Sequence, residues 1–333
     1  MTAAVSVAQG ATNNVSFRNR IINGAMVIDQ RNAGASTSVQ TTTSYATCDR
    51  WAVGSSQNSK FTVQSSTAAP SGFISSLLAT SSSAYSITST DNFNLEQRIE
   101  GLNCVDLGWG TASAAAVTLS FWVRSSLTGT FGGSLRNNDG SRSYPFNYTI
   151  SVSNTWEQKT VSITGDTSGT WLTTNGVGIR VGFSLGSGST LSGAAGSWAG
   201  ANYLNATGAT SVVGTSGATF YITGVQLEKG STATSFDYRP YGTELSLCQR
   251  YYEVGDAFFI SYTTITSNGG YAIPFRVTKR STPTLTQTNV GATSYPATTN
   301  NTNVTVNSFT TYRTASGTGG AQFIETWTAA SEL

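Results

Sequence analysis

In the stretch "VTLSFWVRSS" (residues 117–126), Val117, Leu119, Phe121 and Val123 alternate with Thr118, Ser120, Trp122 and Arg124. Because successive side chains of a β-strand point to opposite faces, the apolar residues at every second position from Val117 to Val123 would share one buried face. Four other segments alternate in the same way: "FNYTISVS" (146–153), "WEQKTVSIT" (156–164), "VGIRVGFSL" (177–185) and "ATFYITGVQL" (218–227). Turn-forming clusters such as "NNDGS" separate them, without helical spacers. The pattern predicts an all-β fold, an antiparallel jelly-roll β-sandwich.

One segment of this region predicts a helix instead. In "STDNFNLEQRIEGLN" (89–103), a Ser, Thr or Asp at 89–91 can cap a short helix, and Gly101 can end it. Leu95 and Ile99, four residues apart, would then share its buried face. We therefore expect one or two helical turns here.

The chain changes character near residue 245. The segment "ELSLCQRYYEV" (244–254) is compatible with a strand or with a short helix at a domain boundary. A second set of strand-like segments follows: "AFFISYTTI" (257–265), "GGYAIPFRVTKRSTPTLTQT" (269–288) and "VTVNSFTTYRT" (304–314). Pro274 and Pro283 belong at strand edges or turns, where a missing N–H costs nothing. We predict a short N-terminal segment at 1–16, the jelly roll at 17–245 and a smaller C-terminal β-sandwich domain at 246–333.

The chain carries unusually little charge. Only 10% of its 333 residues are charged and the net charge is +2, whereas about a quarter of the residues in a typical domain are charged. Without a basic run, binding to nucleic acid by phosphate neutralisation is excluded. No apolar run approaches the ~20 residues that cross a bilayer, so no membrane insertion is expected. A surface rich in hydroxyls and amides suits neutral polar partners such as sugars, or close packing against other protein.

The reactive side chains argue against catalysis and against a metal or cofactor. The chain has no His, and its three cysteines, Cys48, Cys104 and Cys248, are far apart. We predict that they are buried thiols, that there is no metal site and no cofactor, and that Ser–His or Cys–His catalysis is excluded. Polysaccharide cleavage would need two carboxylates roughly 5–10 Å apart. Glu96 and Glu100 could share one face of the expected helix, but solvated or salt-bridged carboxylates beside Arg98 are the favoured interpretation.

Several motifs occur together in a consistent order. They are "NRIINGAMVIDQRNAG" (19–34), "CDRW" (48–51), "LEQRIEG" (95–101), "VTLSFWVRSSLTGT" (117–130) and "ATFYITGVQLEKGSTATSFDYRPYGTELSLCQRYYE" (218–253). In this combination the chain resembles bacteriophage tail-fibre and virion-surface proteins with a carbohydrate-binding-module-like jelly roll. The resemblance covers most of the chain up to residue 254, and "PFRVTKRSTPTL" (274–285) is only loosely similar to tail-fibre ends. No shaft of heptads or collagen-like repeats is present, which suggests a fibre tip or short appendage.

The resemblance implies adhesion to host cell-surface glycans by a non-catalytic fibre protein. It also implies a homotrimer, contacts with other virion proteins, a host polysaccharide partner, and residues 1–16 as a short virion-attachment segment. The protein would be assembled in the host cytoplasm and located on the virion, at the tail or the capsid surface. The alternative is a structural capsid-decoration or head-fibre protein, and a polysaccharide depolymerase is the third hypothesis.

Glycan recognition needs exposed aromatic faces beside groups that bond hydroxyls. Three Gly-rich loops present aromatic side chains: "LGWGT" with Trp109, "SGTWL" with Trp171, and "GSWAGANYL" with Trp198 and Tyr203. We take these four as candidate glycan-binding residues. Packing in the core or between subunits is the alternative for each.

The stretch "FYITGVQLEKGSTATSFDYRPYGTELSLCQRYYEV" (220–254) concentrates charge in a chain that otherwise avoids it. Its Asp237 and Arg239, with Arg31 and Arg50 near the N-terminus, are predicted to form a polar seam between domains or subunits. Arg–carboxylate pairs at such a seam specify geometry more than they add stability. A sugar-binding site and a solvated linker remain the alternatives for this stretch.

Overall fold

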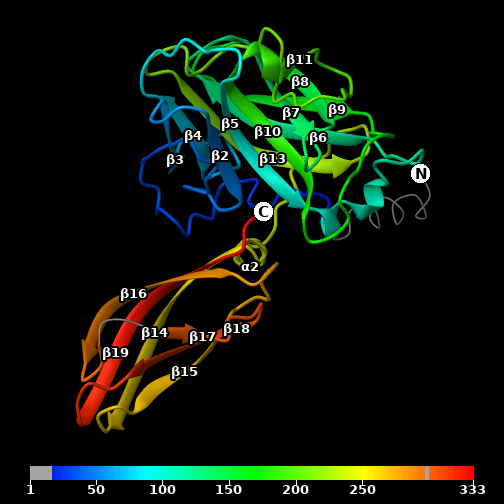
Figure 1. The fold of residues 1–333 in the computed structure, drawn as a ribbon. Coiled ribbons are helices and arrows are strands. Elements are labelled where there is room, and N and C mark those ends of the chain that lie inside the picture. Colours follow the sequence, from blue (N-terminus) through cyan, green and yellow to red (C-terminus); the bar gives the residue numbers. More distant parts are fainter. Residues whose placement is uncertain (1–16, 297–299) are drawn as a thin grey trace, which may run out of the picture.

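The computed structural model describes residues 17–296 and 300–333. The predicted attachment segment at 1–16 lies outside the described residues. Two β-sandwiches lie on either side of one helix, α2 (Tyr241–Gln249), and the C-terminus returns to this junction (Figure 1). None of the helices in the described residues is long and apolar enough to span a membrane.

The first sandwich consists of two facing antiparallel sheets. The six-stranded sheet has the order β1 (Thr37–Ser38), β3 (Phe61–Ser66), β4 (Ser76–Ser81), β13 (Thr219–Lys229), β6 (Val117–Ser125) and β9 (Glu157–Ile163). The five-stranded sheet has the order β2 (Trp51–Ser55), β5 (Asn92–Glu100), β10 (Val177–Ser187), β7 (Gly129–Arg136) and β8 (Ser143–Ile150). Two short parallel strands, β11 (Ser192–Gly193) and β12 (Asn205–Ala206), pair with each other, and β12 lies against β7 and β8. Three 3-10 turns complete it: η1 (Gly101–Asn103), η2 (Val105–Leu107) and η3 (Ser189–Leu191).

Strand β6 shows why this sequence folds as a sandwich. Its residues at every second position from Val117 to Val123 are fully buried between the sheets. The ring of Phe121 lies 4.9 Å from those of both Tyr148 and Phe183 in the opposite sheet, each in an edge-to-face contact. The predicted all-β fold, an antiparallel jelly-roll sandwich followed by a smaller β-sandwich, is therefore confirmed.

The helix predicted within 89–103 is wrong. Residues 92–100 form strand β5, paired with β2 and β10, and only η1 follows as a helical turn. Leu95 and Ile99, four residues apart, share a face in a strand as well as in a helix. The alternating polar residues, with Glu96 among them, point to the other face, and the two neighbouring strands supply the hydrogen bonds.

The second sandwich begins after α2, so "ELSLCQRYYEV" contains both a helix end and the start of a strand. Its three-stranded sheets have the orders β14 (Tyr252–Thr263), β19 (Gly319–Ala330), β16 (Thr284–Thr293), and β15 (Asn268–Pro274), β18 (Ser308–Thr314), β17 (Asn300–Thr302). Pro274 ends β15 and Pro283 immediately precedes β16. Between the sheets, Trp327 packs against Phe275 and Phe309.

Candidate functional site

An apolar cavity of about 300 Å³ opens on the first sandwich beside α2. Three segments form it: the N-terminal segment 19–27, the β3–β4 loop at 72–74, and residues 236–244, which lead into α2. The N-terminal segment runs along β13, where Val225 N–H donates to the Gly24 carbonyl at 2.9 Å. A side chain at Gly24 would bring its Cβ within 2.2 Å of the Val225 carbonyl oxygen, so this approach requires glycine.

Aromatic rings dominate the wall of this cavity. Phe73, Phe236 and Tyr238 form a mutual cluster with centroid separations of 5.1, 5.5 and 4.7 Å. The Tyr238 hydroxyl donates to the Gly72 carbonyl at 2.8 Å, which fixes the ring against the β3–β4 loop. Tyr238 and Tyr241 nevertheless remain 58% and 63% exposed. The aromatic surface is therefore held in place but accessible to a ligand.

Polar groups line one side of the same cavity. The backbone N–H of Asn19 donates to Oδ2 of Asp237 at 3.2 Å. Within the described residues, the other carboxylate oxygen, Oδ1, has no hydrogen-bond donor. Arg239 forms an ion pair with Glu244 at 3.2 Å and donates to the Ile21 carbonyl at 3.1 Å. Rigid aromatic faces beside a few fixed polar groups are the arrangement typical of small-ligand sites.

Asp237 and Arg239 were predicted to form a seam, and these contacts show what they join. Both bind backbone groups of the N-terminal segment, and Arg239 also binds Glu244 at the start of α2. Asn23 N–H donates to the same Glu244 carboxylate. An interaction of these residues with another subunit remains a prediction.

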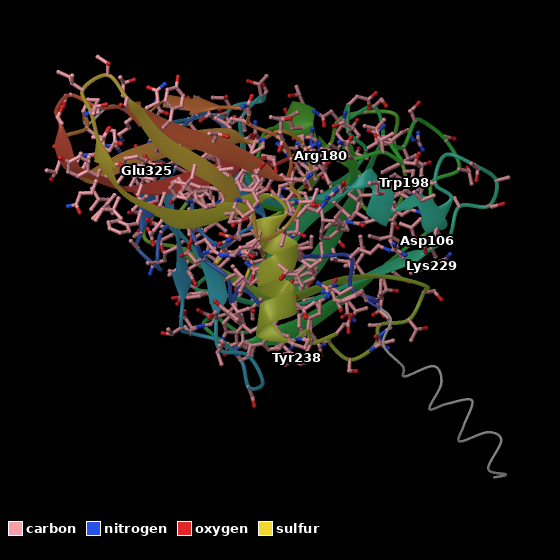
Figure 2. All side chains as sticks on the ribbon, turned by 90° about the horizontal axis from the view of Figure 1, so that it is seen from below. Asp106, Arg180, Trp198, Lys229, Tyr238 and Glu325 are labelled. Atoms are coloured by element: carbon pink, nitrogen blue, oxygen red, sulfur yellow. The ribbon has the colours of Figure 1, made fainter. Side chains whose placement is uncertain are left out.

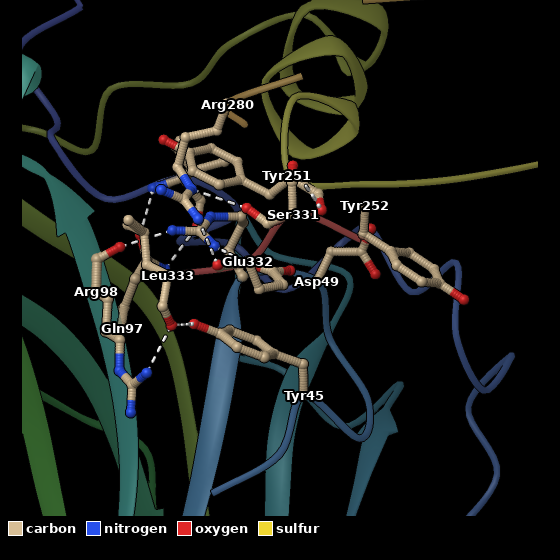
Figure 3. A network of polar contacts seen from close by, with 12 residues as sticks. Tyr45, Asp49, Gln97, Arg98, Tyr251, Tyr252, Arg280, Ser331, Glu332 and Leu333 are labelled. Atoms are coloured by element: carbon tan, nitrogen blue, oxygen red, sulfur yellow. Dashed lines mark hydrogen bonds and ion pairs between the residues drawn. The ribbon is translucent and has the colours of Figure 1, made fainter. Parts of the chain in front are cut away.

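Arg31 and Arg50 lie at the junction with the second sandwich, where both bind Glu332. The Arg31 Nη2 atom lies 2.7 Å from Glu332 Oε1, and the guanidinium of Arg50 stacks 3.5 Å from the Tyr251 ring centroid. Arg98 donates to the Leu333 carbonyl at 2.5 Å, and Arg280 donates to the Glu332 carbonyl at 2.8 Å (Figure 3). Three arginines of the first sandwich thus hold residues 332–333, and Arg280 of the second sandwich binds the same segment.

Asp49 is buried beside this junction, and burial raises its pKa to about 6, although hydrogen bonds from Gln30 and the nearby Arg31 favour ionisation. The folded protein therefore binds this proton more tightly than the unfolded chain, in which the pKa is near its usual 3.8. The resulting stabilisation is complete at low pH and is lost as pH rises through about 6.

We expect the free energy of unfolding to increase by about 1 kcal/mol when pH falls from about 7 to about 5, because one pKa unit corresponds to about 1.4 kcal/mol. The Asp49→Asn variant should lose most of this increase. Thermal unfolding across this pH range measures it, and an undiminished increase in the variant would contradict the assignment. The pKa values of Asp91, Glu96, Glu100 and Asp106 are lowered, so these carboxyls titrate below this window.

The three tryptophans predicted to stack on glycans lie together in one cluster. Trp109, Trp171 and Trp198 have ring centroids 4.6, 5.3 and 5.4 Å apart and are nearly perpendicular to one another. Each indole N–H donates to a nearby backbone carbonyl, at 2.8, 3.1 and 2.7 Å respectively. Their faces are therefore largely covered by each other, and a cavity of only about 180 Å³ lies beside Trp109 and Trp171.

Tyr203 lies apart from the tryptophan contacts. Its ring covers Gly193, where an added Cβ would come within 2.3 Å of it, so this glycine is required by close packing. Trp198 and Tyr238 occupy well-separated parts of the first sandwich (Figure 2). Glycan binding by the four predicted residues remains a prediction, and the aromatic cavity is a different site.

The carboxylates considered for cleavage are both engaged. Glu96 is ion-paired with Arg98 at 2.9 Å, Arg180 at 3.5 Å, and Arg136. Burial opposes its ionisation, but the three guanidiniums outweigh this and hold its pKa below the usual value. Glu100 accepts hydrogen bonds from Arg250 and Tyr251 and likewise has a lowered pKa.

The cysteines are free and buried, and burial raises the pKa of the Cys48 and Cys104 thiols to about 12. Among the residues described, no three His, Cys, Asp or Glu side chains gather in a metal-binding group.

No protein-family model and no curated protein matches this chain. Among solved structures it is similar to the enzymatically active domain of bacteriophage CBA120 tailspike protein 4, at 14% identity and a TM-score of 0.33, over 65% of this chain and 22% of that one. It is also similar to a putative sugar binding protein from Bacteroides thetaiotaomicron, at 13% identity and a TM-score of 0.34, over 64% and 100% of the two chains.

A third similar structure is the family 11 carbohydrate-binding module of a Clostridium thermocellum cellulase, at 10% identity and a TM-score of 0.31, over 61% and 99% of the two chains. The strand order and register given above define the class of protein: an antiparallel jelly-roll β-sandwich followed by a second β-sandwich.

Proposed function

We propose that this protein is a non-catalytic virion fibre or appendage protein of a bacteriophage and that it binds a neutral saccharide of the host cell surface. The observation that supports saccharide binding is the aromatic cavity, in which Tyr238 and Tyr241 are more than half exposed beside Asp237. The resemblance of residues 19–253 to virion-surface proteins supports the placement on a virion.

The cavity suits a sugar better than a charged or purely apolar ligand. Aromatic faces attract the C–H groups of a pyranose ring, while carboxylate and backbone groups bond its hydroxyls. Arg239 and Glu244 in the wall already pair with each other, and a neutral ligand leaves that pair intact. Asp237, the other charged residue of the wall, can accept a hydrogen bond from a hydroxyl. Each site is expected to be weak, and several copies on one virion would raise the avidity by ~10²–10⁴.

Binding without cleavage is the form of the proposal that the carboxylates support. A general acid of a glycosidase needs a raised pKa. Glu96 and Glu100 instead have lowered pKa values and are held by arginines. Unchanged size of host polysaccharide after incubation with the protein is the expected result.

We predict that Tyr241→Ala weakens retention on purified host lipopolysaccharide about tenfold, because one lost stacking contact is worth about 1–1.5 kcal/mol. Tyr238→Phe, which keeps the ring, should bind like the wild type. Trp198→Ala distinguishes the aromatic cavity from the tryptophan cluster as the binding site, and it should leave binding intact. Equilibrium binding to immobilised polysaccharide measures all three.

Equal binding by Tyr241→Ala and the wild type would contradict the cavity assignment, and loss with Trp198→Ala would transfer the site to the tryptophan cluster. Failure of the wild type to bind either host cells or their lipopolysaccharide would defeat the adhesion proposal. Immunogold labelling of capsids rather than tails would then favour the alternative, a capsid-decoration protein.

A further inference from the structure

The second sandwich exposes a row of large apolar side chains on one strand. Along β14, the inner positions pack into the core, whereas Phe258, Ile260 and Tyr262 point outward and are 56%, 65% and 82% exposed. Scattered exposed apolar residues are ordinary on protein surfaces. Three at consecutive outward positions of one strand form a continuous stripe.

The stripe continues across the sheet. In the strand register, Phe258 lies opposite Ile324 of β19, and Ile324 lies opposite Gly291 of β16. Val290, at the register shift next to Gly291, is 61% exposed. The four most exposed side chains offer roughly 500 Å² of accessible surface, which is in the range that marks interaction sites on soluble proteins.

In the register of its three strands this outer face carries one charge, Asp256, at the next outward position of β14 before Phe258. Opposite Ile260 and Phe258, β19 presents Gln322 and Ile324, and β16 continues these rows with Thr293 and Gly291. The charges nearest in the sequence, Arg313 and Glu325, are fully buried and paired with each other between the sheets at 3.3 Å. Among the described residues on β14, Asp256 is the acidic side chain closest to the stripe, and it lies on the α2 side.

The edge of the sheet is only partly covered: the Phe258 N–H donates to the Tyr271 hydroxyl at 3.0 Å, and Arg276 donates to the Val254 carbonyl at 2.9 Å. Exposed edge strands usually carry a lysine, a proline or a bulge that prevents association. Strand β14 pairs with β19 over its twelve residues, Tyr252 to Thr263, without a register shift, and its outward positions from Phe258 onward carry neither lysine nor proline. A long, regular, apolar edge of this kind favours contact with another chain.

We propose that the outer face of β14, β19 and β16 binds the same surface of a second copy of this chain. A face whose charge is limited to Asp256, beyond the end of the apolar stripe, offers little complementarity to a highly charged partner, and the uncharged stripes of two copies meet without like-charge repulsion. With the threonine methyl groups of β16 included, the surface approaches the ~800 Å² per partner of a standard interface. Self-association through this face is independent of saccharide binding.

The position of the face gives the association a consequence for the assembly. The second sandwich extends away from the first, beyond α2 (Figure 1). Copies joined through β14 therefore keep the aromatic cavity of each first sandwich uncovered. Because each copy uses the same surface, the contact closes at two chains, and the pair presents two cavities, which is the condition for avidity.

The test is the mass of the full chain in solution, measured by sedimentation equilibrium at micromolar concentration. We expect an oligomer for the wild type and a single-chain mass for Ile260→Lys. The matched control is Val152→Lys, which places the same charge at a 56% exposed apolar residue of the first sandwich and should leave the mass unchanged. A single-chain wild type, or an Ile260→Lys variant that keeps the wild-type mass, would overturn the proposal.

A second measurement avoids dependence on the folding of the lysine variant. The three native cysteines are buried, so a thiol introduced by Tyr262→Cys can be labelled selectively. We expect its labelling by a maleimide to be at least tenfold slower at high protein concentration than after dilution to single chains. A rate that does not depend on concentration would equally overturn the proposal.

Discussion

Glu332→Ala should lower the free energy of unfolding by about 3–5 kcal/mol, because it leaves a buried guanidinium without a counter-charge and, among the described residues, with only the Arg98 carbonyl as acceptor. Arg50 is 1% exposed and ion-pairs with Glu332, and Arg31 binds the same carboxylate. Removing the carboxylate leaves the Arg50 guanidinium against Tyr251 in a site from which water is largely excluded. The loss should also weaken the coupling between the two sandwiches.

Thermal and denaturant unfolding measure this change. We expect a lower midpoint and, with the junction weakened, two separate transitions instead of one. The matched control is Asp106→Ala, which removes a carboxylate bound by Arg20 at 2.8 Å but 54% exposed. An exposed pair of this kind contributes less than about 1 kcal/mol. A Glu332→Ala loss no larger than that of the control would contradict the structure of the junction.

Glu96→Gln is expected to cost about as much, 3–5 kcal/mol, within the first sandwich. Its carboxylate is 3% exposed and forms ion pairs with Arg98, Arg136 and Arg180 on the outer face of the five-stranded sheet. The amide preserves the shape of the side chain but leaves three neighbouring guanidiniums with no counter-charge. For a sandwich of this size the midpoint should fall by roughly 10 °C.

The same substitution on a less buried pair is the control. Glu157→Gln changes a carboxylate paired with Lys159 on strand β9, where both side chains are partly exposed, at 17% and 18%. It should cost less than about 1 kcal/mol. If Glu96→Gln is as mild as this control, Glu96 is not the electrostatic centre of that sheet. If it instead abolishes release of oligosaccharide from host polysaccharide, the protein is a depolymerase.

The strands could be predicted from the sequence because their period of two is expressed in large side chains. In β6 the large apolar residues at every second position from Val117 to Val123 identify the buried face, and all of them are fully buried. Segment 92–100 was wrongly predicted as a helix because the four-residue spacing of Leu95 and Ile99 places them on one face in a helix and in a strand alike. Only the neighbouring strands β2 and β10, which supply the hydrogen bonds, decide between the two.

The aromatic cavity could not be found from local sequence. Its walls come from segments far apart in the chain: Tyr238 bonds the carbonyl of Gly72, 166 residues away. Phe236 and Tyr238 stand in the charged stretch 220–254, for which the sequence predicts a polar seam between domains or subunits. The sequence does show that Tyr238 and Tyr241 stand close together in "FDYRPYG" (236–242). In the structure, the ion pair between Arg239 and Glu244 lies beside them.

The tryptophans illustrate the opposite limit. Trp109, Trp171 and Trp198 stand in Gly-rich loops, which made them look accessible. The three loops converge, and each ring covers part of the others. A Gly-rich sequence indicates a surface loop but not which other loops pack against it. The mutual burial of these rings therefore cannot be predicted before the fold is known.

The claim on which the function depends is that the cavity beside α2 holds a sugar ring. A crystal structure of the protein with an oligosaccharide cut from the host's surface polysaccharide tests it most directly. The account predicts a pyranose ring stacked on Tyr238 or Tyr241, with a hydroxyl bonded to Asp237. A sugar bound at Trp198, or an empty cavity at saturating oligosaccharide, would contradict it.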